Sequence, residues 1–149
     1  MINYEINSQT MAIIPISKNV TKVIEEDGEL IINKNTFEII EHSCRYFGST
    51  YEGRHIGTKE ILGISYKTPI LIEESQNIII FPTTSSRQPM CSWICLNKIN
   101  NCINDKYKTT IIFKNGYHLN LDISIGSLKN QIYRSTMLES IIRKRTKIS

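Results

Sequence analysis

Apolar and polar residues alternate most regularly along residues 107–123, with the period of two that is typical of strands with one buried face. The alternation is interrupted at Gly116, so the segment predicts a β-hairpin. A two-residue turn would pair Phe113 with His118 and place an apolar residue opposite a polar one. A three-residue loop pairs Phe113 with Tyr117 and keeps one face apolar. We therefore predict the second register, with Gly116 in the left-handed conformation of a β-bulge.

Shorter apolar runs predict the other strands of an antiparallel sheet. One run ends near Pro15, which lacks a backbone N–H and therefore suits an edge strand. Two further runs flank Asp27-Gly28, a dipeptide that favours a tight hairpin turn. The predicted strands are residues 11–16, 20–26, 29–33, 69–72, 78–81 and 91–96, with a polar loop over residues 82–89.

Helical spacing of apolar residues predicts one helix in the middle of the chain, over about residues 36–47. Asn35 has the side chain of a good N-cap, and Gly48 follows at the position where a left-handed C′ residue ends many helices. Residues 49–63 are polar and contain several glycines. We predict a loop there, with room for a short second helix.

A C-terminal helix is predicted over about residues 127–145, with Ser127 as its N-cap. Its apolar residues form two stripes on roughly opposite sides, so both sides require burial. Two interpretations stay open, namely that the second stripe contacts a partner subunit or that it is sandwiched within one monomer. The first stripe contains Leu128, Ile132, Leu138 and Ile142, and the second contains Tyr133, Met137 and Ile141.

These elements predict one α+β domain over residues 1–149, with a mostly antiparallel sheet, one mid-chain helix and one C-terminal helix. A domain of this size buries about 68–70% of its unfolded surface, so its core needs no disulfide or metal. The first ten residues lack the basic and apolar regions of a signal peptide, and no apolar run reaches the roughly 20 residues that span a bilayer. We therefore expect a cytoplasmic protein.

The net charge of +4 is unevenly distributed along the chain. Residues 1–30 carry two basic and five acidic side chains, whereas residues 124–149 carry six basic side chains and one acidic side chain. A basic end is compatible with a polyanionic partner and equally with a solvated tail.

The usual signatures of catalysis and metal binding are missing from the sequence. Its cysteines contain no C-x-x-C pair, so small buried thiols are favoured over a zinc site. His42 and Cys44 point to different faces of the predicted helix and form no dyad. There is no phosphate-binding loop, G-x-G-x-x-G, H-E-x-x-H or G-x-S-x-G motif. We therefore expect no enzymatic activity, no metal and no cofactor.

Basic and small polar side chains gather instead in the predicted loops. Guanidinium groups, hydroxyls and exposed backbone N–H groups are what phosphate contact requires, and glycine lets the backbone approach closely. Each such side chain alone is typical of an ordinary solvated surface. Their concentration in loops rich in Gly, Ser and Thr favours a binding surface.

Six stretches of the chain are distinctive enough to compare with known families. They are SCRYFGSTYEGRHIGT at residues 43–58, KTPI at 67–70, FPTTSS at 81–86, PMCSWI at 89–94, FKNG at 113–116 and NQIYRST at 130–136. These stretches resemble the competence transcription factor ComK family of low-GC Gram-positive bacteria. The resemblance covers about residues 39–136, and its first and third stretches are the most specific.

The resemblance implies a nucleoid-associated activator of genes for DNA uptake and transformation, which recognises paired A-rich and T-rich boxes from the minor groove as a dimer or tetramer. A narrow A-tract minor groove has an enhanced negative potential that attracts arginine, which agrees with the basic loops. The expected DNA contacts are Arg45, Arg54, Lys67, Arg87 and Arg134, supported by His55, Lys59, Ser85, Ser86 and Asn130. The aromatic residues Phe37, Phe47, Phe81 and Trp93 are expected in the core and not against bases.

The sequence leaves a partner and an alternative function open. Family members often extend into a longer C-terminal tail that an adaptor of the Clp protease recognises, whereas this chain stops soon after Arg143-Lys144-Arg145. A Clp adaptor protein is therefore a candidate partner whose control through that tail is in question. The alternative function is a shortened paralogue that acts as a protein-interaction module and modulates a full-length regulator without binding DNA itself.

Overall fold

The computed structural model describes residues 3–105 and 108–146. Its elements confirm the predicted α+β class, with mostly antiparallel sheet, a mid-chain helix and a C-terminal helix. In chain order they are β1 (Thr10–Ser17), β2 (Val20–Glu25), β3 (Gly28–Ile32), α1 (Thr36–Tyr46), α2 (Tyr51–Leu62), β4 (Ile70–Glu73), β5 (Ile78–Pro82), β6 (Trp93–Cys95), a 3₁₀ turn (Leu96–Lys98), β7 (Ile99–Asp105), β8 (Lys108–Phe113), β9 (His118–Leu121) and α3 (Ile125–Thr146).

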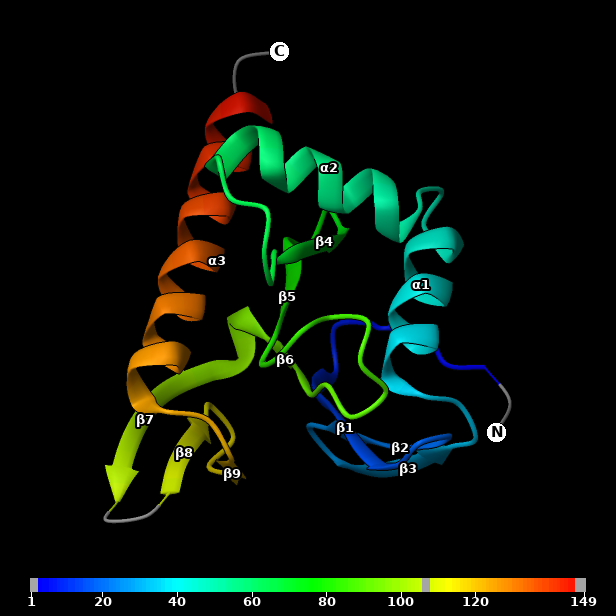
Figure 1. Ribbon diagram of the computed structural model, residues 1–149, viewed down its shortest axis with the longest axis vertical. Coiled ribbons are helices and arrows are strands. Elements are labelled where there is room, and N and C mark those ends of the chain that lie inside the picture. Colours follow the sequence, from blue (N-terminus) through cyan, green and yellow to red (C-terminus); the bar gives the residue numbers. More distant parts are fainter. Residues whose placement is uncertain (1–2, 106–107, 147–149) are drawn as a thin grey trace.

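The strands form two antiparallel sheets (Figure 1). The larger sheet has the order β3-β2-β1-β6-β5-β4, and the smaller has the order β7-β8-β9. Helix α2 lies across one end of the molecule, where it contacts α1 at one end and α3 at the other (Figure 1).

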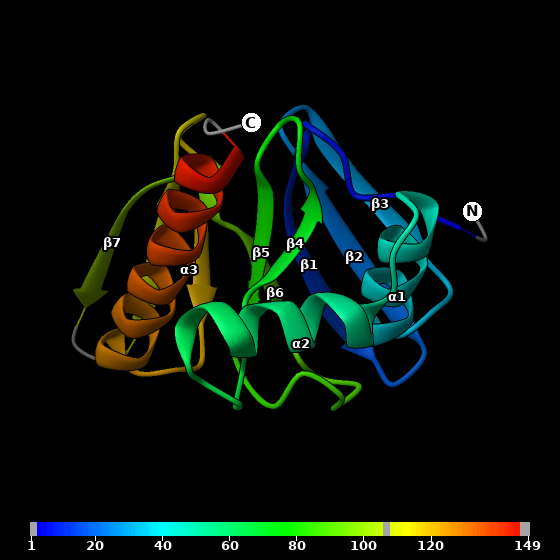
Figure 2. The ribbon, with the colours of Figure 1, turned by 90° about the horizontal axis from the view of Figure 1, so that it is seen from above.

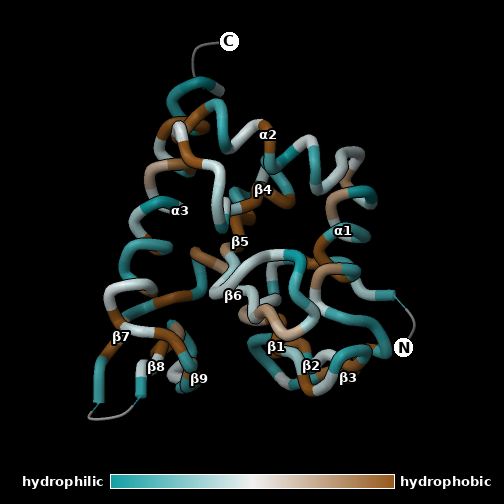
Figure 3. The backbone as a smooth tube through the Cα atoms, viewed as in Figure 1, coloured by the Kyte–Doolittle hydropathy of each residue, from teal (hydrophilic) through white to brown (hydrophobic). Residues whose placement is uncertain are grey.

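Apart from its exposed β3 edge, the larger sheet is buried on both faces. On one face Ile13, Val23 and Trp93 pack in a cluster with Ile39 and Ile40 of α1. The other face packs against the smaller sheet and the start of α3 through Met11, Ile24, Phe81, Ile94, Ile111, Phe113 and Leu128. Because both faces are covered there, β4, β5 and β6 are almost entirely apolar, and much of the tube at β4 and β5 is brown in Figure 3.

The β8–β9 hairpin has the predicted register. Ile111 pairs with Leu119, and Phe113 donates its backbone N–H to the carbonyl of Tyr117 at 2.9 Å. Gly116 has φ +92°, the left-handed conformation that the three-residue loop requires. The outer end of the predicted alternation, at Tyr107, lies outside the described residues.

Replacement of Gly116 by alanine should lower the free energy of unfolding by about 1–2 kcal/mol, because a Cβ atom is strained at positive φ. Gly28 of the β2–β3 hairpin provides the matched control, because its φ is outside the left-handed region and a Cβ there meets open space. Gly28→Ala should change stability by less than about 0.5 kcal/mol. Urea titration followed by Trp93 fluorescence measures both, and equal losses would refute the conformational argument.

The mid-chain helix begins and ends as predicted. The Asn35 side chain accepts a hydrogen bond from the Glu38 backbone, and Glu38 accepts one from Asn35 in return, which completes a capping box. Gly48 follows the helix with φ +85°.

Three local predictions are corrected in the helices and in β1. Residues 49–63 do not form a loop with a short helix, because α2 occupies Tyr51–Leu62 with Thr50 as its N-cap. Helix α3 begins before Ser127, and Ser124 is the residue that caps it. Strand β1 is interior and not at an edge, and its Pro15 is tolerated because β6 pairs only with Ala12 and Ile13.

The hairpin between β2 and β3 is present, but its turn lies one residue earlier than predicted. Glu25 pairs with Gly28, so Glu26 and Asp27 form the turn. The β7 strand, at Ile99–Asp105, was not predicted at all.

The second apolar stripe of α3 is on the surface of the monomer. Tyr133 is 63% exposed and Met137 is 39% exposed, so the interpretation that this stripe is sandwiched within one monomer is wrong. Leu128 and Leu138 of the first stripe are fully buried. Among the described helices, none is long and apolar enough to cross a bilayer.

Candidate functional site

Three segments of the chain surround one open cavity beside α2. They are α2 itself, the loop over residues 63–69 and the loop over residues 83–91, both of which run along the same side of the helix (Figure 2). Together they surround an open cavity of about 420 Å³, which we call the basic cavity. It is lined by Tyr51, Glu52, His55, Ser65, Tyr66, Lys67, Ser85, Ser86 and Arg87.

Helix α2 is joined to the 63–69 loop by side-chain hydrogen bonds. His55 Nδ1 lies 2.6 Å from the hydroxyl of the buried Thr68, and the Thr58 hydroxyl donates to the carbonyl of Pro69 at 2.8 Å. The helix ends at Gly63, whose φ of +68° turns the chain back along the helix. These contacts fix Lys67, which follows in the same loop, beside His55.

Arg87 lies on an aromatic surface at the edge of the cavity. Its guanidinium carbon is 4.9 Å from the centroid of the Phe37 ring and 5.4 Å from that of Tyr51. The Tyr51 ring also stacks on His55, and its hydroxyl is 2.7 Å from that of Ser86. Burial raises the pKa of Tyr51 above its ordinary value, so this hydroxyl stays protonated at neutral pH.

One carboxylate faces these cations. Glu52 Oε2 is 3.2 Å from Arg87 Nη2, and both side chains are more than half exposed. An exposed pair of this kind contributes little to stability, so a stronger anion can replace the carboxylate. The Arg87 guanidinium is therefore held in position and can bind an anion from solution.

The 83–91 loop is itself closed by hydrogen bonds. Thr83 donates its backbone N–H to the carbonyl of Ser92 at 2.9 Å, and the Thr36 hydroxyl donates to the carbonyl of Cys91 at 2.6 Å. The second bond ties the loop to the start of α1. In Figure 3 this loop, in front of β6, is mostly pale to teal, in keeping with its polar composition.

Gln131 of α3 connects the 63–69 loop to the end of β5, where the 83–91 loop begins. Its side-chain amide donates to the carbonyl of Lys67 at 2.9 Å and to that of Pro82 at 2.8 Å, and the residue is 3% exposed. One turn further along, Arg134 Nη1 donates to the carbonyl of Tyr66 at 3.0 Å. Helix α3 therefore both sets the spacing of the loops and adds a cation next to the cavity.

Of the ten residues predicted as DNA contacts, five line the basic cavity and a sixth, Arg134, contacts its lining residue Tyr66. His55, Lys67, Ser85, Ser86 and Arg87 line it. Arg134 borders it through Tyr66, and Asn130 is exposed one turn earlier on α3. Lys59 is exposed on α2, one turn after His55 and therefore on the same side of that helix.

Arg45 and Arg54 lie elsewhere. Arg45 is exposed on α1, where its guanidinium is 3.6 Å from the carboxylate of Glu41. Arg54 faces α3 and borders a separate cavity of about 80 Å³ that Gly57 and Leu138 also line. Its Nε atom is buried and has no hydrogen-bond partner among the described residues.

Sequence reasoning missed the residues that build the site. Gln131 was detectable in principle, because it is a polar residue in the buried stripe of α3, between Leu128 and Leu138. Tyr51, Glu52 and Thr68 gave no such signal, because their partners are distant in sequence.

The buried cysteines are unreactive, and the side chains that could bind a metal are dispersed. Burial raises the pKa of Cys44 to about 11 and that of Cys95 to about 12, so both thiols stay protonated at neutral pH. All four cysteines are free, and Cys102 alone is partly exposed. In the described part of the chain, no three His, Cys, Asp or Glu side chains gather as a metal site.

Comparison with known proteins gives two matches. The family model described as ComK protein matches residues 1–147. The competence transcription factor of Bacillus subtilis (strain 168) is 37% identical over 147 residues, which cover 96% of this chain and 77% of that relative. No solved structure matches the chain.

Proposed function

This chain belongs to the ComK protein family, and on that premise we propose that it regulates transcription of competence genes by binding A/T-rich DNA through the minor groove. In this proposal the protein acts as an oligomer on paired boxes. The basic cavity and the side chains next to it make the contacts with DNA.

The observation that carries the proposal is the convergence of cations from three separate segments. Lys67 and Arg87 line one cavity, and Arg134 lies beside it. The hydroxyls of Ser85 and Ser86 add uncharged donors between the cations. Guanidinium, ammonium and hydroxyl groups are the usual donors to phosphate oxygens.

Preference for A·T pairs would come from the shape of the groove. The minor groove distinguishes A·T from G·C but little else, so its width and deformability provide the remaining information. The Arg87 guanidinium lies over the Phe37 and Tyr51 rings, and a guanidinium held in this way loses little entropy on insertion into a narrow groove.

A salt titration tests the electrostatic part of the proposal. With roughly four phosphate contacts per protomer, from Lys59, Lys67, Arg87 and Arg134, the logarithm of the association constant should fall against the logarithm of salt concentration with a slope of about −4. Fluorescence anisotropy with an A/T-box duplex measures the slope. A response that is flat in salt would exclude phosphate contact by these residues.

Removal of the carboxylate that competes with DNA should strengthen binding. Glu52→Gln is expected to raise the affinity for an A/T-box duplex roughly 3- to 10-fold at low salt, because Arg87 loses its partner and the phosphate loses a repulsive neighbour. The matched control is Glu60→Gln, which makes the same charge change on an exposed residue of α2 outside the cavity. If anisotropy titrations show the same gain in affinity for both variants, the gain comes from the change in net charge alone.

A further inference from the structure

An exposed aromatic ring lies at the rim of the basic cavity. Tyr66 belongs to the 63–69 loop, which leaves the end of α2 beside α3 (Figure 1). It lines the cavity and is nevertheless 62% exposed. The Lys67 ammonium is 5.5 Å from the centroid of its ring. The ring therefore belongs to the same surface as the cations that contact DNA in the proposed function.

We propose that Tyr66 discriminates A·T from G·C pairs by placing its ring edge-on against the floor of the minor groove. This inference rests on the proposed function, because it assigns one step of DNA recognition in the same site to one side chain. The cations contact the sugar-phosphate backbone and provide affinity, whereas the ring contacts base edges and provides selectivity.

The backbone that carries Tyr66 is held in a strained conformation. Lys67 has φ +52°, a left-handed conformation that is unfavourable for residues other than glycine and persists only where the surroundings hold it. From α3, Arg134 donates to the carbonyl of Tyr66 at 3.0 Å and Gln131 donates to that of Lys67 at 2.9 Å. The next residue, Thr68, is bonded through its hydroxyl to the histidine of α2.

This support distinguishes Tyr66 from an ordinary surface residue. Large apolar side chains that are exposed singly are common on proteins and need no explanation. The backbone under Tyr66, however, is fixed from two helices, so the ring is presented to DNA from an ordered loop. A group that is positioned before binding loses less entropy when it binds.

The chemistry of the groove floor explains how a ring would discriminate. A·T pairs present only the acceptors adenine N3 and thymine O2, whereas a G·C pair adds the exocyclic amine of guanine, which projects into the groove. A flat ring that enters edge-on reaches the floor at A·T pairs and meets this amine at G·C pairs. The phenol hydroxyl also donates to the A·T acceptors. The ring thus favours A·T pairs mainly because the guanine amine excludes it.

The neighbouring cation fits the same placement. The minor groove is about 6 Å wide between its sugar-phosphate walls. When the Tyr66 ring occupies the middle of the groove, an ammonium 5.5 Å from its centroid lies near one wall. Lys67 can then contact a phosphate there while the ring remains on the floor.

Removal of the ring should reduce selectivity and leave the electrostatic contacts in place. Tyr66→Ala is expected to lower the ratio of affinities for A/T-box and G·C-rich duplexes at least roughly 10-fold, the size typical of a base-edge contact. The salt slope should stay unchanged, because the ring carries no charge. Tyr66→Phe keeps the ring and should keep the ratio within about 3-fold of that of the natural chain. Fluorescence anisotropy measures all three quantities.

The matched control is Tyr46→Ala. Tyr46 is also 62% exposed, but it lies on α1, where its ring packs edge-to-face on Phe47 and does not line the basic cavity. Its removal should change the ratio less than about 2-fold. Circular dichroism checks that each variant folds.

A duplex with inosine in place of guanine isolates the amine. Inosine·cytosine pairs lack the exocyclic amine in the minor groove, so the natural chain should bind this duplex within about 3-fold of the A/T-box duplex. Tyr66→Ala should distinguish inosine from guanine at least roughly 10-fold less well than the natural chain does.

The outcomes separate this inference from the function on which it rests. A natural chain that binds neither duplex, or that treats inosine like guanine, would overturn minor-groove recognition and the role of Tyr66 together. A natural chain that prefers inosine to guanine, with the same preference in Tyr66→Ala, leaves the proposed function intact and refutes the role of Tyr66. An equal loss of selectivity in Tyr46→Ala refutes that role as well.

Discussion

Arg87→Ala is expected to weaken binding to an A/T-box duplex roughly 10- to 100-fold, since a hydrogen bond to a charged group is worth about 1.5–3 kcal/mol. The substitution also removes a cation that Phe37 and Tyr51 hold in place, so the loss includes a pre-organised contact. The salt slope should become shallower by about 1, because one phosphate contact is lost. Anisotropy titrations at several salt concentrations measure both quantities.

The matched control for this prediction is Arg45→Ala. Arg45 has the same side chain and a similar exposure, but its guanidinium lies 3.6 Å from the carboxylate of Glu41 on α1, away from the basic cavity. Its loss should change the affinity less than about 3-fold, through net charge alone. If Arg45→Ala weakens binding as much as Arg87→Ala does, the cavity is not the DNA-binding site.

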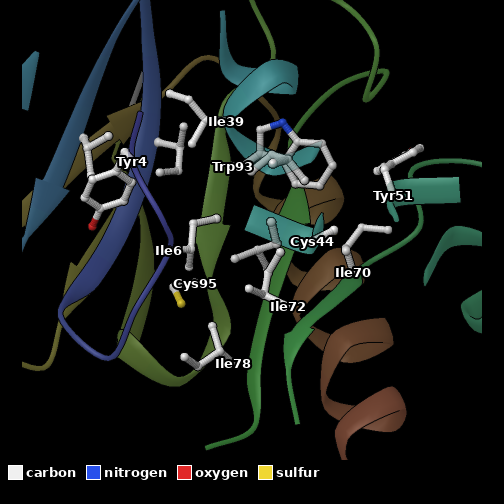
Figure 4. Close-up of a cluster of buried hydrophobic side chains, with 14 of the residues drawn as sticks. Tyr4, Ile6, Ile39, Cys44, Tyr51, Ile70, Ile72, Ile78, Trp93 and Cys95 are labelled. Carbon is white, nitrogen blue, oxygen red and sulfur yellow. The ribbon is translucent and has the colours of Figure 1, made fainter. Parts of the chain in front are cut away.

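The largest expected effect on stability is that of Trp93→Ala. Trp93 is fully buried between the larger sheet and α1, where it packs with Ile39, Cys44 and Ile70 (Figure 4). Truncation leaves a cavity in the main core and should lower the free energy of unfolding by about 3–5 kcal/mol. Because Trp93 is the single tryptophan of the chain, the unfolding of this variant is measured by circular dichroism in urea.

Trp93→Phe separates packing from hydrogen bonding. The indole Nε1 atom is buried and has no hydrogen-bond partner among the described residues, so its removal breaks no bond. Phenylalanine keeps most of the apolar contact, and we expect a loss of about half that of alanine or less. Equal losses for the two variants would contradict an account in which packing dominates.

Local patterns were sufficient to predict the β8–β9 hairpin and α1. In the hairpin, one register keeps Ile111 and Phe113 on the same apolar face, and Gly116 permits the loop that this register needs. In α1, the cap at Asn35 and the glycine at residue 48 mark both ends. These signals reside in a few neighbouring residues, so sequence reasoning detects them.

Helix α2 was predicted only as a short helix within a loop, and strand β7 was not predicted, because both depend on tertiary contacts. Gly53 and Gly57 each cost α2 roughly 0.8–1 kcal/mol relative to alanine. The helix is stabilised instead by burial of Tyr51 and Thr58 against the sheet and the 63–69 loop. Strand β7 has few apolar residues, and its pairing with β8 defines it.

The sequence predicted which types of residue form the candidate site, but not where in the fold the site lies. Sequence reasoning selected Arg45, Arg54 and Arg87 on equal grounds, because all three are arginines near Gly, Ser or Thr. Only Arg87 reaches the cavity, since its position follows from the closed 83–91 loop and the rings beneath it. Gln131 holds this loop and the 63–69 loop together from a helix about fifty residues away, which no local pattern encodes.

The central claim is that the isolated chain recognises A/T-rich duplex through the basic cavity. The most direct measurement compares its affinity for an A/T-box duplex with that for a G·C-rich duplex of equal length, by anisotropy at two salt concentrations. The account predicts binding of the A/T-box duplex at least roughly 100-fold tighter than that of the G·C-rich duplex. Equal affinity for both duplexes, or no binding by the chain alone, would contradict it.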